Sequence, residues 1–293
     1  MEIFENPDPS ALLRLLEEME PRYEPSFVSL GYLIQEMYGT VLSLVSRVLE
    51  MERLGAFSKE PRYCHIPLGV EALRRQTEGL MELLQFPDAA CQRRGHILQG
   101  LREFYERPSS LLLELQSTQL EKLLEDTVHF RMECASTTKA MADQVFYMRQ
   151  GLEKKPLRKG TALSLEGSGY VSLQEVLLPL GEEAFKMDSL AFLFRKEGAF
   201  IEKLEEEYST ALGELRRIAE EMTPFQEASE GMPQGISGDI PQERAFLQIF
   251  QGYSTREERH VFREFFASRG GIPEYAASAE DAEQGDISGV DFF

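Results

Sequence analysis

The sequence predicts an all-α protein: a long antiparallel helical bundle, or coiled-coil-like hairpin, with short accessory helices and a disordered acidic C-terminal tail. Apolar side chains recur at steps of three and four over residues 25–54 and again over 172–222. This is the period with which one helix packs along another. No stretch shows the alternation of apolar and polar residues that a half-buried strand requires. Short connections between long helices favour antiparallel neighbours.

The central element is a helix expected from Pro25 to Leu54. Its inward stripe consists of Phe27, Leu30, Ile34, Met37, Val41, Leu44, Val48 and Met51. A second apolar set flanks this stripe and consists of Val28, Leu33, Tyr38, Leu42, Val45 and Leu49. Because Glu36 is the only charged residue between Phe27 and Ser46, we expect this helix to lie inside a bundle and to be covered on most sides.

N-cap residues, prolines and glycines set the other helix boundaries. We expect a short helix that ends before Pro21, and two helices after the central one, over about 67–86 and 88–107, the second capped by Asp88. A long helix should run from Ser109 to about Lys154. Its expected inward set is Leu120, Leu124, Val128, Met132, Ala135, Val145, Met148 and Leu152.

The last long element is expected to be one helix from Ser172 to Met222. Ser172 and Glu175 match a capping box at its start, and Pro179 should kink its first turns. Glutamates crowd its outer face after Gly198, which is typical of a solvated helix surface.

These signals divide the chain into four parts. Residues 1–222 form the long-helix bundle, and 223–241, rich in Gly, Pro, Ser and Gln, form a linker. Residues 242–269 form a short helical hairpin. Residues 270–293 form an acidic tail that we expect to be disordered alone.

Composition excludes several classes of partner. With 31 Lys+Arg against 50 Asp+Glu the net charge is −19, which disfavours binding to nucleic acid or anionic lipid. No run approaches the roughly 20 apolar residues of a membrane span, so we expect no membrane insertion. The acidic N-terminus is unlike a signal peptide. Cys64, Cys91 and Cys134 show no C-x-x-C spacing, and a reducing, cytoplasmic location is expected.

No motif in the sequence points to catalysis, a metal or a cofactor. The four histidines, His65, His96, His129 and His260, lie on four separate segments. Glu257 with His260 and Glu125 with His129 are unpaired fragments of the motifs that a metal-binding bundle needs. There is no nucleophile elbow, Walker A loop or dinucleotide fingerprint. The sequence therefore favours a protein without an enzymatic site.

The end of the chain has a pattern of its own. Apolar and acidic residues are interspersed there at the end of a flexible acidic segment: Asp286, Ile287, Val290, Asp291, Phe292 and Phe293. A disordered segment that ends in hydrophobic anchors can dock in a groove on a partner protein and order as it binds. The alternatives are that the two phenylalanines pack on their own bundle, or that a clamp- or polymerase-type protein recognises them.

This layout resembles the CheZ-type chemotaxis phosphatases, in which a long helical hairpin precedes a linker and an acidic peptide with an apolar end. The resemblance covers the tail and the order of elements. It implies a response regulator as partner and an Asp and a Gln one turn apart on the hairpin. Here Asp143 and Gln144 are adjacent, about 100° apart round the helix, and Asp88 and Gln92 have the right spacing but open a short helix.

The sequence thus predicts a cytoplasmic, non-enzymatic adaptor. Its bundle would serve as a scaffold, with a homodimer through the long helices as a further expectation, and its C-terminal peptide would bind a partner protein. The alternative function is a helical phosphatase or regulator acting on a response regulator.

Overall fold

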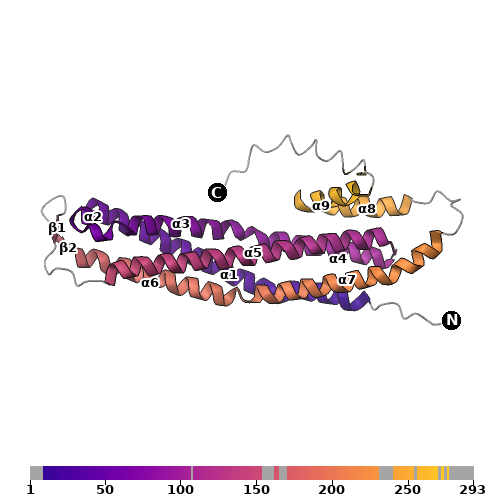
Figure 1. The fold of residues 1–293 in the computed structure, drawn as a ribbon, viewed down its shortest axis with the longest axis horizontal. Coiled ribbons are helices and arrows are strands. Elements are labelled where there is room, and N and C mark those ends of the chain that lie inside the picture. Colours follow the sequence, from indigo (N-terminus) through magenta and orange to yellow (C-terminus); the bar gives the residue numbers. More distant parts are fainter. Residues whose placement is uncertain are drawn as a thin grey trace. The chain divides into compact units, whose positions relative to one another are not determined.

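A computed structural model describes residues 9–106, 108–153, 162–164, 170–230, 240–253, 256–269, 272–273 and 276. The described chain is almost entirely helical (Figure 1), which confirms the all-α fold class. Its helices are α1 (Pro9–Arg53), α2 (Ala56–Lys59), a 3-10 turn (Pro61–Tyr63), α3 (Ile66–Leu83), α4 (Gln85–Glu106), α5 (Ser110–Glu153), α6 (Leu173–Glu197), α7 (Phe200–Glu230), α8 (Ile240–Gly252) and α9 (Arg256–Ala267).

The chain divides into two compact units. The first unit takes its described residues from 9–22, 87–127 and 203–276, and the second unit comprises 23–86 and 128–202. The α8–α9 hairpin therefore belongs to the first unit, together with α4 and the first part of α5.

The inward stripe of α1 forms the centre of the second unit's core. Its members from Leu30 to Met51 are all buried, as predicted. At one end of this core four aromatic rings meet: Phe86 stacks on Phe130 with centroids 4.5 Å apart, and Phe27 packs edge-on against Phe200 at 4.9 Å. Aromatic pairs of this geometry add roughly 0.5–1.5 kcal/mol to the burial of their surface.

The prediction that a first helix ends before Pro21 is wrong, because α1 runs through both Pro21 and Pro25 without a break. A proline inside a helix costs about 3 kcal/mol. The apolar period continues across this stretch, with Leu16 and Met19 wholly buried and Tyr23 nearly so. Burying each such side chain stabilises by about 1.5–3 kcal/mol, which is enough to offset both prolines.

The prediction that α1 is covered on most sides is also wrong. Three members of its flanking set, Val28, Leu42 and Leu49, are about half exposed. The apolar residues of this helix therefore exceed what the second unit buries.

The long helix α5 has the predicted length but a different inward face. Met132 is 60% exposed, and Thr127 and Thr138 are buried in its stead. Both threonine hydroxyls donate to the carbonyl four residues earlier, at 2.7 Å, Thr127 to Leu123 and Thr138 to Cys134. Because the hydroxyl is satisfied within its own helix, threonine can face the core as a small apolar residue.

The helix expected over 172–222 is two helices, α6 and α7, separated at Gly198 and Ala199. The capping box is confirmed: the Glu175 amide donates to the Ser172 hydroxyl at 3.2 Å, and the Ser172 amide donates to the Glu175 carboxylate at 2.8 Å. At the break a Cβ on residue 198 would lie 3.1 Å from the Phe194 carbonyl oxygen. A side chain there would be crowded, so glycine suits the end of α6.

The expectation of a chain without strands is wrong in one place. β1 (Ala162–Ser164) and β2 (Tyr170–Ser172) pair antiparallel, with Leu163 opposite Val171. Each strand has three residues, too few for an alternating pattern to be recognised in the sequence.

Two other boundaries differ from expectation. α4 begins at Gln85, so Asp88 lies in its first turn rather than at its cap. α7 continues to Glu230, into the segment expected to be a linker. No helix in the described ranges is long and apolar enough to cross a membrane.

Candidate functional site

α6 carries a stripe of large apolar side chains that the second unit leaves uncovered. Leu178, Phe185 and Phe192 are 64%, 59% and 59% exposed. They are spaced seven residues apart, so they lie along one line on the helix. The buried residues of α6 lie on the opposite side, and they include Leu180, Met187 and Phe194.

α5 lies against one flank of this stripe. Arg149 of α5 pairs with Asp188 of α6 at 3.5 Å, and its guanidinium carbon lies 5.5 Å from the centre of the Phe185 ring. Phe146, one turn before Arg149, is 57% exposed. We refer to Phe146, Leu178, Phe185 and Phe192 as the α5–α6 apolar face.

α1 lies against the other flank of α6. Lys186 pairs with Glu36 at 3.2 Å, and the Ser43 hydroxyl donates to the Glu183 carboxylate at 2.8 Å. The polar groups on both sides of α6 therefore bind neighbouring helices of the same unit, while the stripe between them faces solvent.

A second candidate is a buried polar cluster in the first unit, centred on Glu258 of α9. Its carboxylate is fully buried and lies 2.6 Å from Nδ1 of His96 on α4. The Gln119 side-chain amide, from α5, donates to the Glu258 backbone carbonyl at 3.1 Å. Two helices, α4 and α5, thus contact one residue of α9.

Tyr253 and Gln116 complete this cluster, and both are buried. The His96 ring meets the Tyr253 ring edge-on at 5.6 Å. Burial, and then the neighbouring Glu258 carboxylate, raise the pKa of the Tyr253 phenol, and the Gln119 and Gln116 side chains lower it by less. The phenol therefore stays protonated at physiological pH.

A carboxylate beside an imidazole could serve as a base and its orienting group. Here the carboxylate is sealed from solvent, and the imidazole, 19% exposed, is the accessible member of the pair. The contacts join α9 to α4 and α5, so the cluster holds the α8–α9 hairpin in the first unit. Sequence reasoning missed Glu258 and considered its neighbour Glu257. The available signal was its position one turn before Val261 and Phe262, on the apolar side of α9.

A third cluster surrounds the paired arginines of α4. Arg93 lies 2.5 Å from Asp126 and Arg94 lies 3.2 Å from Glu20. Both guanidinium groups are almost completely buried, and each carboxylate offsets part of the cost of desolvation.

The thiols of Cys91, partly buried in the first unit, and Cys134, buried in the second, are poor nucleophiles. Burial, and then a hydrogen bond to Glu20, raise the pKa of Cys91 to about 11. Burial raises the pKa of Cys134 to about 12. A thiol in either setting is almost wholly protonated near pH 7, and the thiolate is the reactive form.

No group of three metal-binding side chains occurs in the described ranges. His260 pairs with Glu264 at 3.2 Å on the surface, whereas the sequence suggested Glu257 as its neighbour in a fragment of a metal-binding motif. The His65 ring occupies the space beside Gly151, where an added Cβ would lie 2.3 Å from its Nε2 atom.

The first unit also has a shallow groove between α5 and α9, with a volume near 370 Å³. Its lining mixes charges of both signs, including Lys122 and Glu264. Arg269 at its edge lies over the Phe265 ring at 3.8 Å and pairs with Glu114 at 2.5 Å. Nothing in the groove selects one sign of charge.

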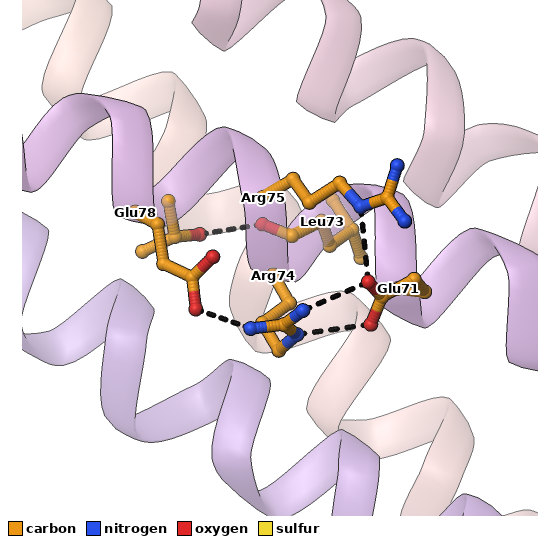
Figure 2. Close-up of polar contacts among 6 residues, drawn as sticks. Glu71, Leu73, Arg74, Arg75 and Glu78 are labelled. Carbon is orange, nitrogen blue, oxygen red and sulfur yellow. Dashed lines mark hydrogen bonds and ion pairs between the residues drawn. The ribbon is translucent and has the colours of Figure 1, made fainter.

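Acidic and basic side chains also meet on the surface of α3, where Figure 2 shows Arg74 between Glu71 and Glu78. Arg74 lies 2.8 Å from Glu71 and 2.5 Å from Glu78, and Arg75 adds a contact of 3.0 Å to Glu71. Hydrogen bonds from Arg74, and then from Arg75, lower the pKa of Glu71 to about 2. These pairs join residues of one solvated helix.

The residues predicted to bind a partner lie outside the described part of the chain: Asp286, Ile287, Val290, Asp291, Phe292 and Phe293. Of the residues considered for phosphatase chemistry, Asp88 and Gln92 lie one turn apart on α4, whereas Asp143 and Gln144 diverge. Gln144 lies against Gly69 of α3, where an added Cβ would be 2.8 Å from its Nε2 atom, whereas Asp143 is exposed.

Comparison with known proteins gives no relative: no family model, curated protein or solved structure matches the chain.

Proposed function

We propose that this chain is a non-enzymatic interaction protein of the cytoplasm. In this proposal an antiparallel bundle of long helices is the scaffold, and an acidic, disordered tail carries the docking residues Asp286, Ile287, Val290, Asp291, Phe292 and Phe293 to a partner protein.

The observation that carries the proposal is the contrast between buried chemistry and exposed apolar surface. The Glu258 carboxylate and the Cys134 thiol are closed to solvent, whereas Phe146, Phe185 and Phe192 are each more than half exposed. Exposed apolar patches on soluble domains mark sites of association. The tail adds the apolar–acidic pattern of segments that order on a partner surface.

The test compares the full chain with a form lacking residues 280–293 and with a Phe292→Ser, Phe293→Ser double variant. A Ser288→Ala variant is the matched control. Helicity and thermal unfolding should be unchanged in all of them, because these residues would contribute nothing to either core. Capture of the partner should be lost in the first two forms and kept in the control.

A synthetic peptide of residues 285–293 should then bind the captured partner and displace the full chain. A truncated form that unfolds, or a partner that binds equally well without the tail, would contradict the proposal. So would accelerated loss of phosphate from a phosphorylated response regulator that disappears in Gln144→Ala or Gln92→Ala, since that result would make the chain an enzyme.

A further inference from the structure

The outer stripe of α6 is complementary to a second copy of the same stripe that runs antiparallel to it. Ser189 lies at its middle, with Phe185 four residues before and Phe192 three residues after. Glu182 lies seven residues before Ser189 and Lys196 seven residues after it. Seven residues are close to two helical turns, so the acidic and the basic side chain share the outer face with both phenylalanines.

Both charges of this stripe are exposed. Their neighbours on the flanks of α6 are engaged, Lys186 with Glu36 of α1 and Asp188 with Arg149 of α5. Neither Glu182 nor Lys196 forms an ion pair with another residue of the described ranges. These two charges are therefore available to a binding partner. Along the stripe the side chains follow the order acidic, aromatic, small, aromatic and basic: Glu182, Phe185, Ser189, Phe192 and Lys196.

We propose that a second copy of this chain covers the α5–α6 apolar face, with the two α6 helices antiparallel and crossing at Ser189. Phe185 of each copy then lies against Phe192 of the other. Glu182 of each copy meets Lys196 of the other, and the two-fold axis makes this pair twice. The small Ser189 side chain at the crossing lets the two helices approach closely.

The exposed aromatic side chains give the proposed contact its apolar area. A phenylalanine offers roughly 150–250 Å² of surface, so Phe146, Phe185 and Phe192, each more than half exposed, present on the order of 300 Å² per copy before any flanking residue is counted. The net charge of −19 opposes association of two copies. Screening at physiological salt, where the Debye length is about 8 Å, limits that repulsion, while the Glu182–Lys196 contacts act at short range.

The proposal is tested by sedimentation equilibrium of the full chain at physiological salt. The unaltered chain should be a dimer. A Phe185→Glu, Phe192→Glu double variant should weaken it at least about a hundredfold, because two central aromatic anchors are lost. Leu68→Glu is the matched control: Leu68 is 75% exposed on α3, and its replacement should leave the dimer unchanged. Equal helicity of the variants would show that folding is intact.

The register is tested by charge reversal. Glu182→Lys alone and Lys196→Glu alone should each weaken the dimer about tenfold, because each places like charges together. The double exchange should restore it. A monomeric chain, a dimer that survives the Phe185 and Phe192 substitutions, or a double exchange without rescue would overturn the proposal. Because it does not rest on the tail, the dimer should persist without residues 280–293.

Discussion

Gly100 and Gly95 lie on the same helix, α4, in opposite surroundings. A Cβ at Gly100 would lie 2.3 Å from the side-chain amide of Gln116, which is itself fully buried, whereas a Cβ at Gly95 meets nothing within 4 Å. We predict that Gly100→Ala lowers the free energy of unfolding by about 1–3 kcal/mol through overpacking. Gly95→Ala should raise it by about 0.5–1 kcal/mol, because alanine favours the helix.

Urea unfolding of the two variants, with equal dependence on denaturant, measures both changes. If Gly100→Ala also raised the free energy of unfolding, the close approach of Gln116 to α4 would be wrong.

The buried polar residues of the first unit could not be predicted from the sequence. Gln116, Gln119 and Glu258 are polar residues in positions that a period-based interpretation assigns to solvent or to caps. Gln119 and Glu258 bind each other, and Glu258 also pairs with His96, so contacts across α4, α5 and α9 accompany their burial. Pairing between distant segments leaves no local mark beyond a polar residue on an otherwise apolar stripe.

At the scale of a single element, charged side chains of α3 form ion pairs with one another within the helix. Its ion pairs (Figure 2) lie three and four residues apart, where helical side chains meet. The pKa of Glu71 is lowered from 4.5 to about 2 by Arg74 and then Arg75. The stabilisation from this carboxylate is therefore fully present above its ordinary pKa and is lost as the pH falls from about 4.5 to about 2.

We predict that Glu71→Gln lowers the thermal unfolding temperature slightly near neutral pH and that the difference from the unaltered chain shrinks through that acid range. Direct titration of the Glu71 carboxylate by NMR should give a pKa well below 4.5. Glu82→Gln is the control, since Glu82 lies on the same helix without an ion pair to another described residue. A Glu71 that titrates at its ordinary pKa would contradict the prediction, and high salt should reduce the effect.

The bounds of α3, α4 and α5 followed closely from the sequence, whereas the start of α1 and the division of 172–222 into α6 and α7 did not. Pro21 was expected to end a helix, and it does not, because the buried residues on either side outweigh its cost. In α5 the inward set was expected to include Met132, whereas Thr127 and Thr138 are buried and their hydroxyls bond within the helix. A one-residue signal is overridden wherever the packing of several neighbours favours the other outcome.

At the scale of the whole molecule, the sequence predicted the fold class but not the division into two units. Both units draw on α1 and α5, so the division does not follow segments of the chain, and composition cannot reveal it. The exposed α5–α6 apolar face was also unforeseen. A stripe of apolar residues looks the same in a sequence whether its own chain or a second molecule covers it.

Continuity of α1 and α5 through both units has a consequence for unfolding. Unfolding one unit would remove the packing of part of each helix, and an isolated helical segment is marginal in water. We therefore predict one cooperative transition for the whole chain. Cys91 reports on the first unit and Cys134 on the second. Their pKa values of about 11 and about 12 make both thiols slow to react while folded.

In a Cys64→Ser background, which removes the exposed thiol, pulsed labelling across a urea gradient should show both cysteines becoming reactive at the same midpoint. Leu101→Ala in the first unit and Met37→Ala in the second, both at wholly buried positions, should each cost about 2–5 kcal/mol. Each substitution should move the two midpoints together. If Leu101→Ala shifted the midpoint of Cys91 and left that of Cys134 in place, the two units would unfold separately, and the shared helices would not couple them.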